Sequence, residues 1–312
     1  PMQLGFFGTG TMGNPMARCL IEAGHQVTVH DLRREATTNL CEMGANWADS
    51  PRIVAEASQV VFTSLPGPAE VERALLDPAN GILSGLRAGG AYIDMTTNSP
   101  AVFRRIAEVC LARGIEVLDA PVSGRPPGMT IMVGGDPVTL TKYRTLLECM
   151  GRNIFHVGET GTGCIAKLVT QYLGYSNFVT AIEGLLIGAK AGVDIRTLAR
   201  IVPVSAGASR VFDNIPRSVF SGEFTSGGTL DIVAKDLHLA CELARDVGAP
   251  SHIGLATDDV LKRAQAQGWG HRGFPIAAQI LEQMAGVQLR APIGIGAAKY
   301  EVTYQGDDPR RG

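Results

Sequence analysis

An excess of charge of one sign, paired cysteines and an uninterrupted apolar run are all lacking in this sequence of 312 residues. It has 28 Lys and Arg against 30 Asp and Glu, so its formal net charge is only -2. No basic field therefore indicates binding to nucleic acid or to an anionic membrane. The apolar stretch 165–192 is broken by charged and polar residues, and no signal peptide is visible. We expect a cytoplasmic protein without a membrane-spanning segment.

The six cysteines are scattered along the chain and form no C-x-x-C pair. No His and Cys residues have the spacing of metal ligands. Such cysteines are typical of reduced, buried thiols in a cytosolic protein. The sequence thus predicts neither a disulfide framework nor a metal site.

What the sequence does contain is a globular composition, with 45% apolar and 19% charged residues. The length favours two domains over one. The first half alternates short apolar runs, such as "QLGFFG", "HQVTVHD", "QVVFTSLP" and "AYIDMTT", with amphipathic stretches. Near-continuous apolar strands separated by helices are typical of a mostly parallel sheet covered on both faces.

After about residue 161 the strand signals largely stop, and helical segments such as "LDIVAKDLHLACELARDVG" dominate. We therefore predict an α/β fold, with an N-terminal doubly wound, mostly parallel sheet and a C-terminal all-helical domain joined to it by a long helix. The predicted domains span residues 1–161 and 162–296. The tail, 297–312, has no periodic pattern, and we expect it to be loose.

A glycine-rich turn follows the first predicted strand, in "GFFGTGTMGNPMA". Gly8, Gly10 and Gly13 form the pattern G-x-G-x-x-G, and Asp31 ends the next predicted strand about 20 residues later. In this pattern the first glycine makes a tight turn, the second lets the backbone approach a pyrophosphate, and the third lets helix and strand pack closely. The pyrophosphate then lies at the helix N-terminus. The sequence therefore predicts a dinucleotide site, although the pattern alone also fits a turn without a ligand.

The residue at the end of the second predicted strand bears on which dinucleotide binds. An Asp at position 31 accepts hydrogen bonds from ribose hydroxyls and repels a 2′-phosphate, which favours NAD. Arg33 and Arg34 follow at once and would suit a 2′-phosphate. We expect NAD, with NADP as the alternative.

Lys167 lies near the start of the long predicted helix, among apolar neighbours and four residues before Gln171. A lysine at such a place can extend its amine to solvent as an ordinary surface residue. A role in acid–base catalysis requires a pKa below the usual value of about 10.4, and desolvation beside a positively charged nicotinamide would lower it. Spacing alone leaves both interpretations open.

Further motifs occur in a set order along the chain. They are "GTGTMGNPMA" from Gly8, the pair Leu65-Pro66, "DMTTNSP" at 94–100, "DAPVSG" at 119–124, "TIMVGG" at 130–135, G-x-G-x-x-x-K at 161–167 and "KDL" at 235–237. With them, nearly the whole chain resembles the β-hydroxyacid dehydrogenases, the family of 3-hydroxyisobutyrate dehydrogenase and tartronate semialdehyde reductase.

This resemblance implies a Rossmann domain, a helical domain like that of 6-phosphogluconate dehydrogenase, a site in the cleft between them, and a homodimer or homotetramer. It implies that Lys167 is the general acid/base and that Ser123 and the Gly124 N–H bind the substrate carboxylate. Consecutive N–H groups in a glycine-containing turn do form a concave site for an anion. By the same matching, the cofactor would be bound by Gly8, Gly10, Thr11, Met12, Gly13, Asp31, Leu65, Pro66, Thr97 and Lys235, and the substrate by Ser123, Gly124, Arg125, Thr97, Gln171, Gly228 and Asp236.

Three positions depart from the family pattern. Arg125 replaces a glycine in a shortened loop, "RPPGM"; Gln171 replaces the usual asparagine; Gly228 replaces an active-site phenylalanine. A lost loop and a lost ring make room, and a guanidinium can hold a second anionic group. We therefore expect a 3-hydroxyacid, or its semialdehyde, that is bulkier or more anionic than hydroxyisobutyrate. The alternative is that Arg125 forms a surface ion pair.

The predicted activity is hydride transfer between NAD and such a small-molecule substrate. One alternative is an NADPH-dependent semialdehyde or imine reductase, although imine reductases generally replace the catalytic lysine. A more remote alternative is a dinucleotide-binding protein without catalysis. The lysine and the residues of the anion site are all present here, which favours an enzyme.

Overall fold

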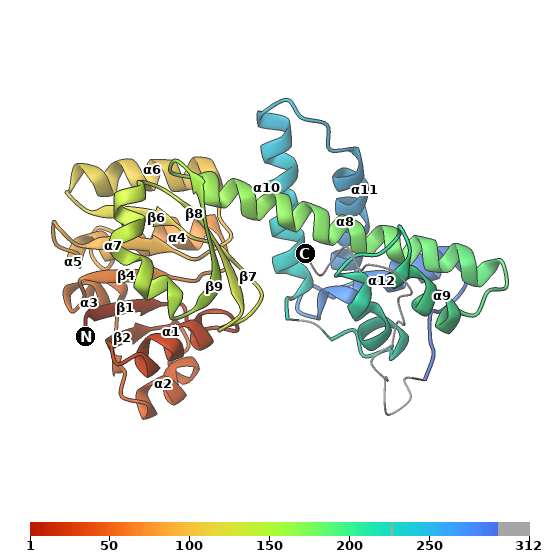
Figure 1. Ribbon diagram of the computed structural model, residues 1–312, viewed down its shortest axis with the longest axis horizontal. Helices are drawn as coiled ribbons and strands as arrows, with labels where there is room; N and C mark the ends of the chain where they lie inside the picture. Colours follow the sequence, from red (N-terminus) through yellow and green to blue (C-terminus); the bar gives the residue numbers. More distant parts are fainter. Residues whose placement is uncertain (226, 293–312) are drawn as a thin grey trace. The chain divides into compact units, whose positions relative to one another are not determined.

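The computed structural model describes residues 1–225 and 227–292 (Figure 1). The chain divides into two compact units, Pro1–Thr170 and a second that begins at Gln171. The boundary expected after residue 161 stays a prediction, and the expected tail at 297–312 lies outside the described residues. Within the described ranges, no helix has the length and apolar character that a membrane crossing requires.

The first unit contains a sheet of nine strands in the order β3-β2-β1-β4-β5-β6-β8-β7, with β9 paired to β8. Its strands are parallel as far as β6, whereas β8 is antiparallel to both β6 and β7. The predicted mostly parallel, doubly wound sheet is thus confirmed. The strands are β1 (Gln3–Phe7), β2 (Gln26–His30), β3 (Asn46–Trp47), β4 (Val60–Thr63), β5 (Ala91–Asp94), β6 (Glu116–Asp119), β7 (Val122–Ser123), β8 (Met129–Gly134) and β9 (Gly151–Gly158).

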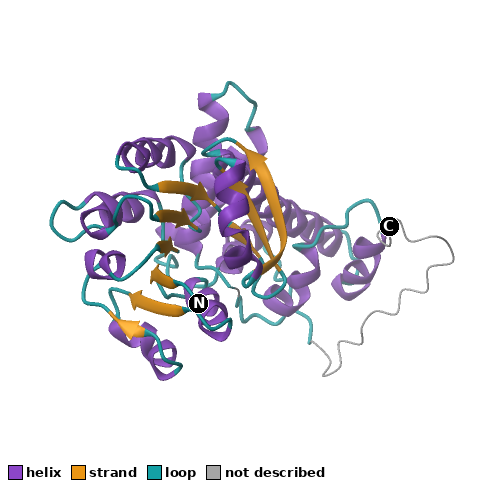
Figure 2. Cartoon of the chain, turned by 60° about the vertical axis from the view of Figure 1, so that its left-hand side comes forward, coloured by secondary structure: helices purple, strands orange, loops and turns teal. Residues whose placement is uncertain are grey.

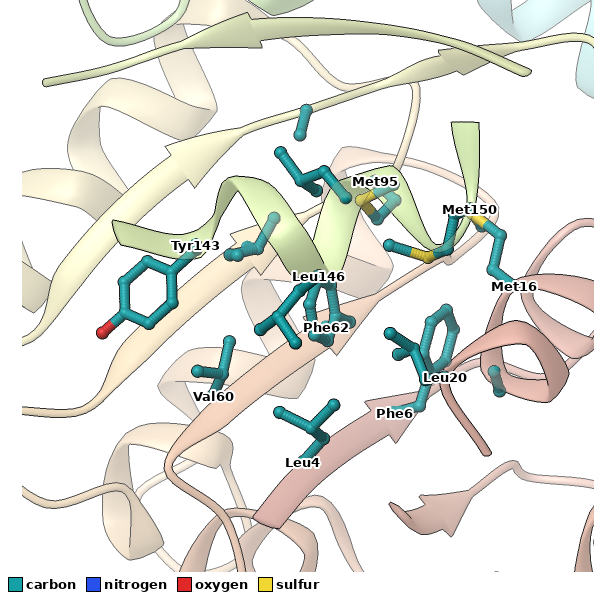
Figure 3. Close-up of a cluster of buried hydrophobic side chains, with 14 of the residues drawn as sticks. Leu4, Phe6, Met16, Leu20, Val60, Phe62, Met95, Tyr143, Leu146 and Met150 are labelled. Carbon is teal, nitrogen blue, oxygen red and sulfur yellow. The ribbon is translucent and has the colours of Figure 1, made fainter. Parts of the chain in front are cut away.

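Helices cover both faces of this sheet. Successive side chains of a strand point to opposite faces, so neighbouring residues pack against different helices. Phe6 packs with α1 and α7 in one apolar cluster, part of which Figure 3 shows. Its neighbour Phe7 packs with α3, α4, α5 and α6 in another. The helical segments are α1 (Gly13–Glu22), η1 (Arg34–Thr37), α2 (Thr38–Glu42), α3 (Pro51–Glu56), α4 (Pro68–Leu76), α5 (Ile82–Gly85), α6 (Pro100–Ala112) and α7 (Pro137–Glu148).

The long helix α8 (Thr162–Lys190) has 29 residues, and the chain divides within it. The described part of the second unit is built of helices, without a strand (Figure 2). This confirms the predicted helical domain. Its elements after α8 are α9 (Ile195–Ile201), η2 (Val202–Val204), η3 (Phe212–Asn214), η4 (Pro216–Phe220), α10 (Leu230–Asp246), α11 (His252–Ala266), η5 (Phe274–Ala277) and α12 (Ala278–Ala285).

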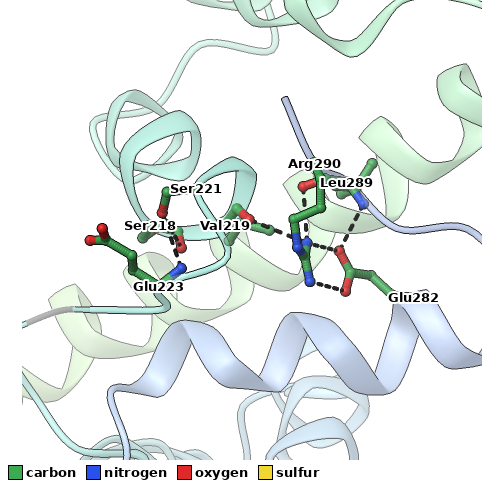
Figure 4. A network of polar contacts seen from close by, with 7 residues as sticks. All are labelled: Ser218, Val219, Ser221, Glu223, Glu282, Leu289 and Arg290. Carbon is green, nitrogen blue, oxygen red and sulfur yellow. Dashed lines mark hydrogen bonds and ion pairs between the residues drawn. The ribbon is translucent and has the colours of Figure 1, made fainter. Parts of the chain in front are cut away.

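An ion pair between Arg290 and the buried Glu282 connects two segments of the helical unit (Figure 4). The Arg290 guanidinium lies 2.6 and 3.0 Å from the two oxygens of Glu282, whose side chain is almost fully buried. Arg290 also donates to the carbonyl of Val219 and lies 4.8 Å from the centre of the Phe224 ring. The two-pronged geometry is the strong form of such a pair. It holds the segment after α12 against η4.

Candidate active site

The glycine-rich turn between β1 and α1 has the geometry that a pyrophosphate requires. Gly8 has a φ of +91°, which favours glycine, and its N–H donates to the carbonyl of His30 at 3.0 Å. A Cβ on Gly13 would lie 1.8 Å from the Gly8 oxygen, so only glycine fits there. A Cβ on Gly10, in contrast, would meet no heavy atom within 4 Å. Backbone is therefore open to a ligand at Gly10 and closely packed at Gly8 and Gly13, as the dinucleotide pattern predicts. Thr11 and Met12 lie in the same turn.

The carboxylate of Asp31 is held beside this turn by two backbone N–H groups. Thr9 and Arg33 each donate to it at 2.8 Å. Arg34 lies with its guanidinium carbon 5.3 Å from the centre of the Trp47 ring, a cation–π contact. Arg34 is thus in contact with Trp47, whereas Arg33 is exposed and follows Asp31 by two residues.

The ends of β4 and β5 are joined by Asp94, a buried carboxylate for which the sequence alone predicted no role. It accepts hydrogen bonds from Thr63 at 2.9 Å, the Thr96 N–H at 3.0 Å and Asn98 at 2.8 Å. Thr96 in turn accepts from the Leu65 N–H at 3.0 Å. Burial raises the pKa of the Asp94 carboxyl, and the hydrogen bonds oppose this. The network fixes the loop of Leu65 and Pro66 against the loop that carries Thr97.

The segment "SGRPPG" forms the turn between β7 and β8, which pair as an antiparallel hairpin. Ser123 pairs with Thr130 in register, and Gly124 turns the chain with a φ of +84°. Ser123, Gly124 and Arg125 are all exposed. Among the residues that the structure describes, no ion pair involves Arg125, which goes against the surface ion pair considered above.

Lys167 is buried, with a relative exposure of 7%. It lies in the second turn of α8, in the same unit as the glycine-rich turn and the hairpin. A lysine is almost never this buried without a specific reason, because its charge loses hydration. The burial favours a specific role over that of an ordinary surface residue, for which an exposed side chain is expected.

In the helical unit, Gln171 and Asp236 are brought together by contacts between side chains. The Gln171 amide nitrogen lies 2.7 Å from one Asp236 oxygen and 2.5 Å from the Tyr175 hydroxyl. Tyr175 also donates to Asp236 at 3.2 Å, and the Lys235 amine lies 2.6 Å from the other Asp236 oxygen. Burial and the neighbouring carboxylate raise the pKa of Tyr175 well above its usual value. The sequence did not predict Tyr175 as a site residue. Its only signal was its position one turn after Gln171.

Gly228 lies just before α10, and a Cβ built on it would make its nearest contact with Val233, at 3.7 Å. That is an ordinary van der Waals distance, so a Cβ at position 228 would meet no clash.

Comparisons with known proteins agree along the chain. The family model of the "NAD binding domain of 6-phosphogluconate dehydrogenase" matches residues 3–158, and that of the "NAD-binding of NADP-dependent 3-hydroxyisobutyrate dehydrogenase" matches residues 161–281. The chain is 33% identical to 2-(hydroxymethyl)glutarate dehydrogenase of Eubacterium barkeri, over 92% of this chain and 97% of that protein. It is 34% identical to 3-hydroxyisobutyrate dehydrogenase of Pseudomonas aeruginosa, over 88% and 96%.

A solved structure of 3-hydroxyisobutyrate dehydrogenase from Salmonella typhimurium has the same fold, with a TM-score of 0.81 and 28% identity. The match covers 90% of this chain and 100% of that one. Sequence and fold agree over both units, and the glycine-rich turn has the geometry that a dinucleotide needs. The chain therefore belongs to the β-hydroxyacid dehydrogenases, a family of NAD(P)-dependent oxidoreductases.

Proposed function

We propose that this protein oxidises the hydroxyl group of a 3-hydroxyacid to the semialdehyde, or catalyses the reverse reduction, with Lys167 as general acid/base. The observation that carries the proposal is the burial of Lys167 in the unit that also holds the glycine-rich turn. The glycine-rich turn would hold the dinucleotide, which would supply a hydride acceptor for the hydroxyl-bearing carbon. In oxidation the Lys167 amine takes the hydroxyl proton, and in reduction it returns that proton to the carbonyl oxygen. Ser123 and the Gly124 N–H hold the substrate carboxylate.

NAD is the proposed cofactor. The Asp31 carboxylate is fixed by the N–H groups of Thr9 and Arg33, so it is placed to accept from a ribose hydroxyl and to repel a 2′-phosphate. Initial rates with the two dinucleotides test this choice. A higher kcat/KM with NAD+ than with NADP+ supports NAD. Asp31→Ala should bring the two kcat/KM values closer together. A higher kcat/KM with NADP+ in the unaltered protein would instead assign Arg33 the dominant role.

A second anionic group on the substrate is the proposed partner of Arg125. The exposed guanidinium lies two residues after Ser123 and has no ion-pair partner within the described residues. 2-(Hydroxymethyl)glutarate, named for the Eubacterium barkeri relative, carries a second carboxylate of this kind.

An NAD+ reduction screen tests the substrate class directly, with 3-hydroxyacids that differ in the size and charge of the substituent at C2. Arg125→Ala should lower kcat/KM for substrates with a second carboxylate by about 10- to 150-fold, the worth of one charged hydrogen bond of about 1.5–3 kcal/mol. It should leave 3-hydroxyisobutyrate unaffected. Arg87→Ala is the matched control, because Arg87 is exposed but precedes β5, at the opposite end of the strand from Asp94. Equal effects of Arg125→Ala on both substrates would contradict the contact.

The proposal includes a homodimer or homotetramer in the cytoplasm. The six cysteines are all free thiols, which suits a reducing compartment. Light scattering during size-exclusion chromatography would measure the oligomeric state, and a monomer at micromolar concentration would contradict this part of the proposal.

A further inference from the structure

A buried carboxylate at the end of β6 binds the start of helix α8. Asp119 is fully buried, and its two oxygens accept from different backbone N–H groups, those of Gly161 and Cys164, each at 2.8 Å. The first N–H groups of a helix lack partners within the helix. A carboxylate at this end also suits the helix dipole. Asp119 thus joins the first turn of α8 to the sheet.

The contact requires glycine on both sides of the carboxylate. Gly134 pairs with Asp119 across β6 and β8, and a Cβ on it would lie 2.5 and 2.8 Å from the two carboxylate oxygens. A Cβ on Gly163 would lie 2.9 Å from one of these oxygens and 2.4 Å from the Met132 carbonyl oxygen. Larger residues at either position would therefore displace the carboxylate from the helix. Burial raises the pKa of the Asp119 carboxyl, and the two N–H groups oppose that shift.

Asp119 is connected to two candidate site residues of its own unit, to Ser123 along the chain and to Lys167 through the helix turn that it binds. Lys167 comes three residues after Cys164, about 4.5 Å further along the helix and on a neighbouring position of the same face. Ser123 comes four residues after Asp119, in the hairpin that β6 leads into. A single side chain therefore connects the strand that leads to the proposed carboxylate site with the helix turn that precedes the proposed base.

From this geometry we infer that Asp119 is a positioning residue, which sets the place of Lys167 relative to Ser123 and Gly124. The inference rests on the proposed function, because it takes Lys167 as the general acid/base. A displacement of a reacting group by about 1 Å can cost up to roughly 100-fold in rate. The carboxylate does not touch the substrate in this account. It acts only through the helix that it holds.

Asp119→Asn tests the inference, because an amide has one acceptor oxygen and can serve only one of the two N–H groups. We expect kcat to fall by about 10- to 100-fold, with the affinity for NAD+ unchanged and the solvent deuterium isotope effect on kcat increased. A merely structural role would not raise that isotope effect. Asp136→Asn is the matched control, since Asp136 accepts from the Thr139 N–H at 2.9 Å at the start of α7, which carries no candidate site residue. Its kcat should equal that of the unaltered protein.

Gly134→Ala displaces the same carboxylate without changing its charge, and it should give the same selective loss of kcat. An unchanged kcat in a folded Asp119 or Gly134 variant would overturn the inference. So would a parallel loss of kcat and NAD+ affinity with no change in the isotope effect. If neither variant folds, hydrogen exchange in the unaltered protein decides, because the amides of Gly161 and Cys164 must be strongly protected, and rapid exchange there would refute the contact.

Lys167→Ala separates this inference from the proposed function. If Lys167→Ala retains its turnover, the acid–base role fails and the positioning role fails with it. If Lys167→Ala loses turnover while Asp119→Asn keeps it, only the positioning role is wrong.

Discussion

Each unit of the chain has a buried carboxylate that orients a candidate site residue. The two carboxylates accept hydrogen bonds from different kinds of donor. Asp119, in the first unit, accepts hydrogen bonds from the backbone N–H groups of Gly161 and Cys164. Asp236, in the helical unit, receives its hydrogen bonds from the side chains of Gln171 and Tyr175 and pairs with Lys235. One is an anchor for main chain, and the other is the centre of a side-chain network.

The two kinds of contact tolerate substitution in different places. A contact to backbone needs space, so it depends on glycine at positions 134 and 163, and the donor Gly161 has a φ of +89°, which itself favours glycine. A contact to side chains depends on each donor. Gln171 stands where the family resemblance implies an asparagine, and its amide nitrogen donates to Asp236 at 2.7 Å. We expect the helical unit to adapt more readily to a new substrate.

The largest effect on stability should come from Asp236→Ala, which removes the shared acceptor of the network. Buried groups left without a partner cost about 1–3 kcal/mol of the free energy of unfolding. Urea denaturation measures this loss. Asp246→Ala, at the exposed end of the same helix α10, is the control and should leave the free energy nearly unchanged. An Asp236 variant as stable as that control would show that the network contributes nothing.

A smaller effect is expected from Tyr175→Phe, which keeps the ring against Phe274 and removes one hydroxyl. The loss of one hydrogen bond should cost about 0.5–1.5 kcal/mol, and kcat/KM should fall because the Gln171 amide is less well fixed. Tyr172→Phe is the matched control. Tyr172 lies on the same helix α8 as Tyr175, and its hydroxyl accepts from the Gly254 N–H of α11 at 2.9 Å. Equal losses of kcat/KM in both variants would assign Tyr175 to stability alone.

The smallest effect concerns Glu116, a partly exposed carboxylate that contrasts with the two buried ones. Burial raises the pKa of Glu116, but hydrogen bonds from Lys142 and Tyr143 outweigh it and hold the pKa below the ordinary value of 4.5. A lowered pKa in the folded state adds stability above the unfolded value, and this stability is lost as the pH falls through the folded value. Glu116→Gln should therefore cost up to about 1 kcal/mol at neutral pH. Thermal melts should show that the difference disappears in acid; a difference that is constant with pH would contradict the ion pair.

Much of the first unit is predictable from sequence, because its site depends on backbone. The glycines at 8, 10 and 13 have the three distinct environments that their spacing predicts, and Asp31 lies beside them. The alternation of apolar runs and amphipathic stretches likewise predicts the parallel sheet. The buried carboxylates Asp94 and Asp119 stand inside quoted motifs, yet their roles follow only from contacts with residues far along the chain, such as Gly161.

In the helical unit, less is predictable. Its helices follow from their apolar periodicity, but the 3₁₀ segments η2 and η3 and the π-helical segment η4 are too short to show such a period. The only sequence signal for Tyr175 is its position one turn after Gln171, and this does not separate it from a core residue of α8. Its hydroxyl becomes meaningful only because α10 brings Asp236 within 3.2 Å. Side chains that meet across helices distant in sequence cannot be paired without the fold.

Turnover of Lys167→Ala with NAD+ and the best 3-hydroxyacid measures whether Lys167 transfers the proton. Dinucleotide binding, followed by nicotinamide fluorescence, should be retained. The rate should fall by about 10²- to 10⁴-fold, while Lys190→Ala, in the last turn of the same helix, keeps its full rate. A Lys167→Ala variant that binds the dinucleotide and turns over at a rate near that of the unaltered protein would contradict the account.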